Sequence, residues 1–245
     1  MYMSKRDKQI EQASRMKSGY NGLLWETGLT GKLEYFFSIT TPPTCNSRCQ
    51  VYRIDPNKIC ANCYSCAAMN YRKAFREKLV QNYLQLKEVL PMEALPVINL
   101  PYERIESHGD VDNVNQVINY FNICNKNPDT QFTVWSKNPD LYDKAIKAGH
   151  AKPKNLIFVL SSFFKNVVAD PGKWPFVDIV FTVFTAEYAI EHDIIINCGG
   201  QKCINCLTCY TPAPGIRYIN EMLKSDQKRY YKMLAEKLKR EAENK

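Results

Sequence analysis

Cysteine is the residue type in this chain with the most chemical potential, and its spacing is specific. Nine of the ten cysteines lie in two short runs, and each run ends in the pattern C-x2-C-x2-C. The first run contains Cys45, Cys49, Cys60, Cys63 and Cys66, and the second contains Cys198, Cys203, Cys206 and Cys209. Two intervening residues allow two thiolates from one tight turn to reach the same metal ion or cluster. The two runs therefore predict metal-binding loops.

The repeated triple suits an iron–sulfur cluster better than a zinc ion. Three cysteines in a row match three corners of an iron–sulfur cube, with the fourth ligand supplied from elsewhere. A single zinc ion usually takes paired C-x2-C units separated by a longer loop, and zinc is the alternative. Two [4Fe-4S] clusters take roughly eight ligands between them. Nine cysteines then leave one thiolate spare, unless one ligand is not a cysteine or the cluster is larger or fused.

The length and composition argue against a disulfide scaffold. The chain has 245 residues, of which 45% are hydrophobic, whereas disulfide-rich chains are usually small, secreted and short of a core. The polar N-terminus lacks the apolar run of a signal peptide, and no stretch of about 18 apolar residues could span a membrane. We therefore expect a cytoplasmic protein without a membrane segment, in which clustered cysteines bind metal. Cys124 lies outside both runs and is expected to be a small buried side chain.

The net charge permits more than one kind of partner. The formal charge is +8, which is compatible with a polyanion such as nucleic acid. Basic residues concentrate in residues 5–17, 72–78 and 224–240, and each set is typical of the solvated face of a helix. A [4Fe-4S]2+ core with four thiolates carries a net charge of about −2. Two clusters would thus offset about half of the surplus, so charge alone does not select a partner.

A second group of candidate residues lies in the segment Glu106-Ser-His108-Gly-Asp110. Side chains alternate along a strand, so Glu106, His108 and Asp110 point the same way if this segment stays extended. Such a trio could bind metal or transfer protons, and these three residues are the predicted catalytic residues. The alternative is that Asp110 caps the next helix. We interpret His150 as an exposed loop residue and His192 as a charge partner at a helix end.

The apolar pattern predicts strands and helices in alternation. A strand at 33–40 precedes the first cysteine run, and a strand at 194–197 precedes the second. The other predicted strands are 95–107, 131–136, 155–161 and 177–184, and the predicted helices are 66–90, 113–124, 139–148, 186–191 and one or two from Ile216 onward. The segment between the fourth and fifth strands reads as a loop, so one crossover helix is absent or reduced.

This order predicts an α/β fold with a mostly parallel sheet and right-handed crossovers. We expect a partial (β/α)6 barrel-like domain over residues 1–245, with cysteine-rich loops after the first and last strands. Residues 1–30 are expected to form a helical or extended appendage, and residues 216–245 a C-terminal helix. If the sheet curls toward a barrel, the two runs share one chamber at the carboxyl ends of the strands. A flat doubly wound sheet would place them farther apart.

The same order of motifs resembles the radical S-adenosylmethionine fold. In that fold a first strand is followed by a cysteine loop and a helix, and three cysteines hold a [4Fe-4S] cluster that leaves one iron open for the cofactor. The usual motif is C-x3-C-x2-C. Here Cys45-x3-Cys49 is followed, after an insertion, by Cys60-x2-Cys63. The resemblance implies a partial barrel, an iron–sulfur cluster and S-adenosylmethionine as a candidate cofactor.

The chain is also similar to an uncharacterised group of bacteriophage cysteine-rich proteins. Those have a C…C-x2-C-Tyr-Ala segment, a strand ending in Ser-Gly-Asp, a later aromatic-Thr-Lys and a cysteine-rich tail. The matching segments are Cys60-Ala-Asn-Cys63-Tyr64, His108-Gly109-Asp110, Trp135-Ser136-Lys137 and the second run, with His108 where Ser is usual. This similarity implies a phage-encoded protein that acts in the cytoplasm of a bacterial host.

Three functional hypotheses follow. The first is an iron–sulfur redox protein or radical-S-adenosylmethionine-like enzyme that uses a small-molecule substrate or an electron donor. The second is a zinc-stabilised module that binds nucleic acid, although the chain resembles no known base-reading motif. The third is a hydrolase-like barrel built on Glu106, His108 and Asp110, in which the clusters are structural. The sequence leaves the oligomeric state open.

Overall fold

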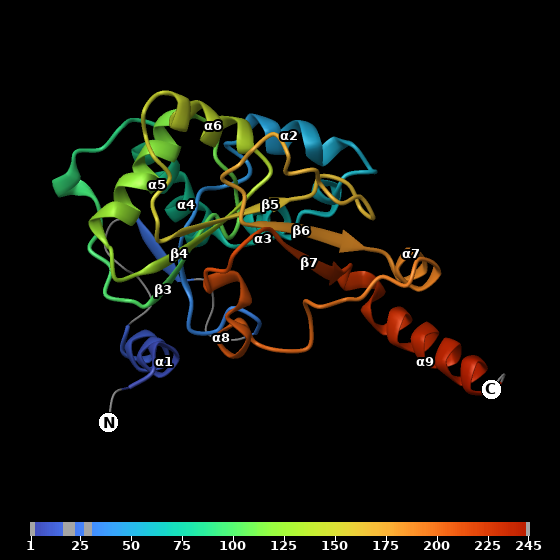
Figure 1. The fold of residues 1–245 in the computed structure, drawn as a ribbon. Helices are drawn as coiled ribbons and strands as arrows, with labels where there is room; N and C mark the ends of the chain where they lie inside the picture. Colours follow the sequence, from blue (N-terminus) through green and yellow to red (C-terminus); the bar gives the residue numbers. More distant parts are fainter. Residues whose placement is uncertain (1–2, 17–22, 27–30, 244–245) are drawn as a thin grey trace.

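The structure, a computed structural model, describes residues 3–16, 23–26 and 31–243. Strands and helices alternate along most of the chain (Figure 1). The strands are β1 Leu24–Glu26, β2 Phe37–Ile39, β3 Tyr102–Ile105, β4 Gln131–Ser136, β5 Leu156–Ser161, β6 Ile179–Phe184 and β7 Arg217–Met222. The helices are α1 Lys5–Arg15, α2 Ser47–Ile54, α3 Tyr64–Tyr71, α4 Lys73–Leu86, α5 Val114–Lys126, α6 Pro139–Lys147, α7 Ala186–Glu191, α8 Cys203–Cys206 and α9 Gln227–Glu243.

The strands form one sheet in the order β1-β2-β3-β4-β5-β6-β7. β1 is antiparallel to β2, and the strands from β2 to β7 are parallel to one another. The sheet is not closed into a barrel. This confirms the predicted α/β class, a partial barrel-like and mostly parallel sheet.

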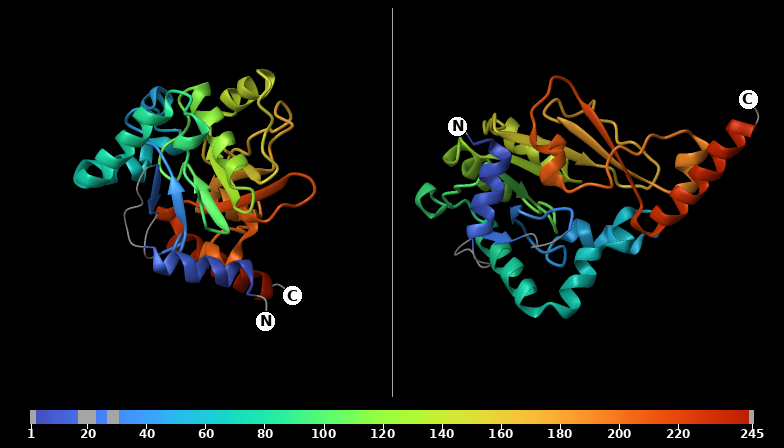
Figure 2. Two further views of the ribbon diagram at one scale, coloured as in Figure 1. Left: turned by 90° about the vertical axis from the view of Figure 1, so that its left-hand side faces the viewer. Right: turned by 90° about the horizontal axis from the view of Figure 1, so that it is seen from below.

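The two faces of the sheet carry different layers (Figures 1 and 2). On one face, Ile105, Val134 and Phe158 belong to the main hydrophobic core, which includes residues of α5 and α6. On the other face, Ile157, Val159 and Ile219 pack against cysteines of the second run. Side chains alternate along each strand, so one strand serves both layers. The second run therefore covers the face of the sheet opposite α5 and α6.

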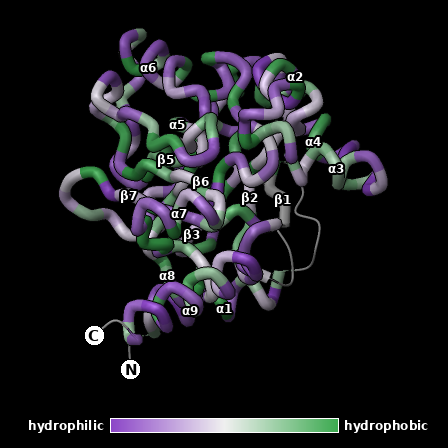
Figure 3. Tube along the Cα trace, turned by 90° about the vertical axis from the view of Figure 1, so that its right-hand side faces the viewer, coloured by the Kyte–Doolittle hydropathy of each residue, from purple (hydrophilic) through white to green (hydrophobic). Residues whose placement is uncertain are grey.

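The central strands are buried because a parallel sheet is covered on both faces. All six residues of β5 are buried, and they are mostly aliphatic or aromatic. This region is hydrophobic in Figure 3, whereas α9 is largely hydrophilic. The strands predicted at 131–136, 155–161 and 177–184 are confirmed to within two residues as β4, β5 and β6. No helix joins β5 to β6 in this part of the described chain, as expected.

The prediction was wrong around the last strand. Residues 194–197 form no strand, and residues 217–222, expected to be helical, form β7. Among the described residues, β7 pairs with β6 on one side and only with a bridge at Cys198 on the other, and its buried residues Ile219 and Met222 are separated by two half-buried polar residues. This mixed pattern hid the strand, because an edge strand needs fewer apolar residues. The second run thus precedes the last strand, rather than following it.

The long helix predicted at 66–90 is divided. α3 ends and α4 begins around Arg72, whose φ of −108° and ψ of 78° are not helical. The helix predicted at 113–124 is confirmed as α5, the one at 139–148 as α6 and the one at 186–191 as α7. Helix α9 occupies the later part of the predicted C-terminal helix, and it packs against α7.

The N-terminal helix is fixed to the sheet by one buried side chain. Gln9 of α1 donates hydrogen bonds to the carbonyls of Tyr35 and Tyr102 and accepts one from the amide of Tyr102. Among residues 1–30, the structure describes α1, β1 and their immediate neighbours, and β1 adds an antiparallel edge to the sheet. In the described parts of the chain, no helix is long and apolar enough to cross a bilayer.

Glu103 of β3 is an unusual buried acid and gives a test of the core. Its side chain is fully buried, and neither carboxyl oxygen has a hydrogen-bond partner among the described residues. Burial raises the pKa of this carboxyl well above 4.5. Above pH 4.5 the carboxyl ionises more readily in the unfolded chain, so stability falls as pH rises toward the folded pKa.

We therefore expect Glu103→Leu to raise the unfolding free energy by about 1–3 kcal/mol at pH 8, because a buried polar group without a partner is costly. The gain over the wild type should shrink as pH falls toward 4.5. Urea unfolding at several pH values measures it, and Glu93→Leu, which changes an exposed carboxylate, is the control. A variant no more stable than the wild type at pH 8 would contradict this account of Glu103.

Candidate metal centres

The first cysteine run follows β2 and is tied to the segment that follows β3. Asn46 caps α2 by accepting a hydrogen bond from the amide of Cys49 over 2.9 Å. The same side chain donates to the carbonyls of Asp110, at 2.8 Å, and Val111, at 3.0 Å. The run therefore lies where it was predicted, at the carboxyl ends of the parallel strands.

Three thiols of the first run are neighbours of one another. Burial raises the pKa of Cys49, and the charges of Asp110, Cys60 and Cys63 raise it further. Burial also raises the pKa of Cys60, where Cys63 acts in the same sense and Lys137 opposes it. Such thiols hold their protons until a cation relieves the repulsion. Cys49, Cys60 and Cys63, which we call the first thiol set, thus form one electrostatic unit.

The other two cysteines of this run lie at its margin. Cys66 is hydrogen-bonded to Cys63 and to Arg53, and its pKa is raised by burial and by Cys63. Cys45 is affected by burial, by Thr44 and by Asp112, and no other cysteine is among its main influences. The sequence spacing alone does not separate these two from the first thiol set.

Polar groups at the ends of β3, β4 and β5 face the first thiol set. Asp110 accepts hydrogen bonds from Ser136 Oγ, at 2.6 Å, and from the amide of Lys137, at 2.7 Å. The ammonium of Lys137 donates to Ser161 Oγ over 2.9 Å, and its charge lowers the pKa of both Cys49 and Cys60. An acid, a base and a hydroxyl therefore line one side of this set.

Glu106 belongs to a closed network instead. Its carboxylate accepts hydrogen bonds from Thr41 Oγ1, at 2.7 Å, from Tyr120, at 2.5 Å, and from Gln116, at 3.1 Å. Burial raises its pKa to about 7, and the bonds from Tyr120 and Thr41 oppose that rise. Its φ is 54°, so the strand has ended by this residue. Glu106 therefore links the end of β3 to α5 and to the residues that follow β2.

His108 lies against the helices of the first run. Its Nδ1 is 3.0 Å from Ser65 Oγ, and its ring contacts those of Tyr64 and Phe75 edge-on. Burial, followed by the charges of Arg104 and Arg72, lowers its pKa to about 4. The imidazole is therefore neutral at pH 7. The three predicted catalytic side chains do not converge, because the chain leaves the extended conformation at Glu106.

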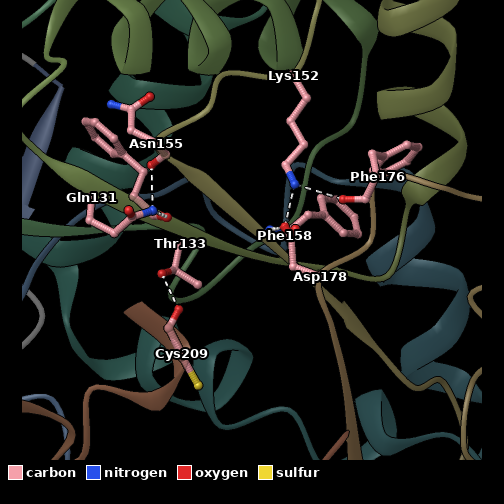
Figure 4. A network of polar contacts seen from close by, with 9 residues as sticks. Gln131, Thr133, Lys152, Asn155, Phe158, Phe176, Asp178 and Cys209 are labelled. Atoms are coloured by element: carbon pink, nitrogen blue, oxygen red, sulfur yellow. Dashed lines mark hydrogen bonds and ion pairs between the residues drawn. The ribbon is translucent and has the colours of Figure 1, made fainter. Parts of the chain in front are cut away.

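The second cysteine run is attached to the opposite face of the sheet by its backbone. Thr133 of β4 donates to the carbonyl of Cys209 over 2.7 Å (Figure 4). The amide of Cys198 donates to the carbonyl of Asn220 on β7 over 3.0 Å. Nearby, Lys152 forms an ion pair with Asp178, which also accepts from the amide of Phe158 and so fixes the start of β5 (Figure 4).

All four thiols of the second run affect one another. Burial raises the pKa of Cys209 to about 12, with further contributions from Cys198, Cys203 and Cys206. The pKa of Cys203 is likewise raised by burial and then by the charges of Cys198 and Cys206, while Arg104 and Lys32 oppose the rise. These four residues, Cys198, Cys203, Cys206 and Cys209, form the second thiol set.

Two cations flank the second thiol set. The ammonium of Lys32 donates a hydrogen bond to Cys198 Sγ over 3.1 Å. The guanidinium of Arg104 lies 3.8 Å from the ring centroid of Trp135, and its charge lowers the pKa of Cys203 and Cys209. Positive charge beside buried sulfur is the environment that anionic metal–thiolate centres require.

The donor sets fit thiolate-bound metal in number and in neighbourhood. All ten cysteines are free thiols. Within residues 3–16, 23–26 and 31–243, no three His, Cys, Asp or Glu side chains stand in the geometry of a bound metal. Ligation would therefore require the sulfurs to turn toward a common point. Sulfur is the donor that iron–sulfur clusters and zinc prefer.

Comparison with protein-family models, with curated proteins and with solved structures finds no match for this chain.

Three residues of the sites were not among those predicted. Arg104 is a charged residue in the short strand β3, beside another charged residue, Glu103, and the sequence did contain this signal. Lys137 follows β4 directly, as expected of a site residue at a strand end. Lys32 lies in a turn 166 residues from Cys198, so no local pattern could connect it with the second run.

Gly109 provides a test of the segment that carries His108 and Asp110. A Cβ at this position would lie 2.4 Å from the carbonyl oxygen of Thr41. We expect Gly109→Ala to lower the unfolding free energy by about 2 kcal/mol or more, since the clash is with backbone and not with a flexible side chain. Denaturant unfolding measures the change. Gly199→Ala is the matched control, because a Cβ there meets nothing within 4 Å; equal losses in the two variants would contradict the close approach at Gly109.

Proposed function

We propose that the chain is an iron–sulfur protein that carries one [4Fe-4S] cluster on each thiol set. The observation that carries this proposal is that neighbouring thiols form two separate groups, one in each cysteine run. Cys49, Cys60 and Cys63 influence one another in the first run. In the second run, all four cysteines do so.

The spacing of the first run favours iron–sulfur chemistry over zinc. A structural zinc ion usually takes paired C-x2-C units separated by a longer loop, whereas the first run ends in C-x2-C-x2-C, in which Cys66 is hydrogen-bonded to Cys63. A [4Fe-4S] cluster accepts three cysteines and leaves one iron available to another ligand. The second thiol set has the complete number for an all-cysteine cluster, which suits electron transfer. Zinc in the second set remains the alternative that metal analysis would distinguish.

The open side of the first cluster is where a substrate or cofactor would bind. A [4Fe-4S] cluster supplies one electron at a time to its ligand. Lys137 would pair with an anionic group of that ligand, and Asp110 holds Lys137 in place through its amide. S-adenosylmethionine, the cofactor implied by the radical-enzyme resemblance, has a carboxylate group that Lys137 would recognise. We therefore propose an iron–sulfur oxidoreductase or radical-S-adenosylmethionine-like enzyme.

The hydrolase hypothesis receives less support from the geometry. It requires a base, an orienting acid and a nucleophile within hydrogen-bond reach. The Glu106 carboxylate is occupied by Thr41, Gln116 and Tyr120, and His108 is bonded to Ser65 instead. This arrangement stabilises the fold and leaves no free base beside His108.

We expect anaerobically reconstituted protein to contain about eight iron ions and eight sulfides per chain, as two [4Fe-4S] clusters require. Cys49→Ser and Cys206→Ser should each remove about half of the iron and lower the soluble yield, because ligation supplies the order of these loops. Cys45→Ser is the matched control and should keep nearly all of it. Iron, sulfide and zinc assays with an absorption spectrum measure these outcomes.

Stoichiometric zinc without sulfide in protein made under iron-replete anaerobic conditions would refute the iron–sulfur proposal. An iron loss in Cys45→Ser equal to that in Cys49→Ser would refute the division of the first run alone.

The ligand side of the first cluster has a separate test. We expect S-adenosylmethionine to change the electron paramagnetic resonance spectrum of the reduced protein. Lys137→Met should weaken this binding about tenfold, as expected for the loss of one charge-assisted hydrogen bond. Lys144→Met, which removes an exposed ammonium from α6, should leave binding unchanged. If the spectrum of the wild type does not change, S-adenosylmethionine is not the ligand of the first cluster, and the assignment of the clusters is unaffected.

A further inference from the structure

Lys32 contacts the second thiol set at two points, although it is 166 residues away from Cys198 in the sequence. Its ammonium donates to Cys198 Sγ over 3.1 Å and forms an ion pair with Glu221 of β7. Its backbone carbonyl accepts a hydrogen bond from the amide of Cys203 over 2.8 Å. The turn that contains Lys32 therefore holds the start of α8 and also directs a cation at a ligand sulfur.

The ammonium is partly shielded from solvent. The side chain of Lys32 is 38% exposed and that of Glu221 is 23% exposed. A hydrogen bond from a cation is stronger in such surroundings than at a fully solvated site. Lys202 differs from Lys32 although it is adjacent to Cys203 in sequence. Its side chain is more exposed, and it forms an ion pair with Glu34.

Each thiol set has cations and an acid beside it. Lys32 and Arg104 oppose the repulsion of the thiols in the second set, while Glu221 acts on Cys198 in the opposite sense. Lys137 and Lys58 act on Cys60 of the first set, where Asp110 opposes them. The second set is distinguished by the hydrogen bond that the Lys32 ammonium donates to Cys198 Sγ. Hydrogen bonds to sulfur and local charge are among the factors that set the potential of an iron–sulfur cluster.

We propose that Lys32 is a positioning residue of the second cluster, and that its N–H···S hydrogen bond makes this cluster the more easily reduced of the two. The inference rests on the proposed function. Reduction adds one electron to a centre that already carries about two negative charges. A positive donor on Cys198 stabilises the reduced form more than the oxidised form, so the second cluster is the electron acceptor within the chain.

A potentiometric titration of the full-length protein, followed by electron paramagnetic resonance, tests this role. Dithionite is the reductant, and the signal lost in Cys206→Ser identifies the second cluster. In the wild type, the midpoint of the second cluster should lie above that of the first. Lys32→Met should shift the reduction equilibrium of the second cluster about tenfold toward the oxidised form, which is about 59 mV for one electron. Lys32→Arg should restore most of the shift.

The ion pair allows the hydrogen bond to be separated from the charge. Glu221→Gln should raise the midpoint, because Lys32 then keeps its full charge toward the sulfur. The double variant Lys32→Met with Glu221→Gln has the same net charge as the wild type, so its remaining shift reports the hydrogen bond itself. Lys202→Met is the control and should leave the midpoint in place. A purely structural role for Lys32 would not give opposite shifts in the Lys32 and Glu221 variants.

Each outcome decides the inference. An unchanged second midpoint in both Lys32→Met and Glu221→Gln, with full iron content, overturns the role of Lys32 and leaves the clusters assigned. If the reduction midpoint of the second cluster lies below that of the first cluster in the wild type, the second cluster is not the electron acceptor within the chain. If Lys32→Met does not retain the second cluster, the test depends on Glu221→Gln: a raised midpoint of the second cluster supports the role of Lys32, and an unchanged midpoint overturns it. A wild-type protein with zinc or no metal on the second run overturns the proposed function and this inference together.

Discussion

Sulfurs buried side by side repel one another when they ionise, and both thiol sets are built around this repulsion. Burial is the largest cause that raises the pKa of Cys49, Cys203 and Cys209, and neighbouring thiols raise it further. Lys137, Lys32 and Arg104 offset part of the effect. Each of the three reaches its sulfurs from a segment outside the cysteine runs, so the sites exist only once the sheet has formed. The position of the strands therefore decides where negative charge can be accommodated.

The sheet separates the two thiol sets in position. The first lies at the carboxyl ends of the strands, beside the connected polar groups of Asp110, Lys137 and Ser161. The second lies on the face opposite α5 and α6, anchored by Thr133 and Asn220. Arg104 of β3 links the two regions electrostatically, since its charge acts both on the second set and on His108. One strand thus influences both centres.

The sequence predicted the regular parts of this structure well. β5 and β6 are almost continuous apolar runs, and such runs identify buried parallel strands without tertiary information. β7 could not be identified in this way, because an edge strand tolerates polar residues such as Asn220 and Glu221. The two cysteine runs were identified from spacing, but which thiols of a run become neighbours was not, since it depends on how the turns fold. Lys32 and the closed network of Glu106 are long-range contacts with no local signature.

The placement of β7 after the second cysteine run affects how the molecule is assembled. β6 is synthesised long before the strand that covers its edge, and the intervening chain includes α7, the second run and η3 (Thr208–Tyr210). Until that segment is ordered, the backbone groups of β6 on this side stay unpaired, beside Val180, Val183 and Phe184. An unpaired hydrophobic edge is a template for association between chains. If a metal orders the second run, as proposed, a shortage of that metal would lead first to aggregation of newly made chains.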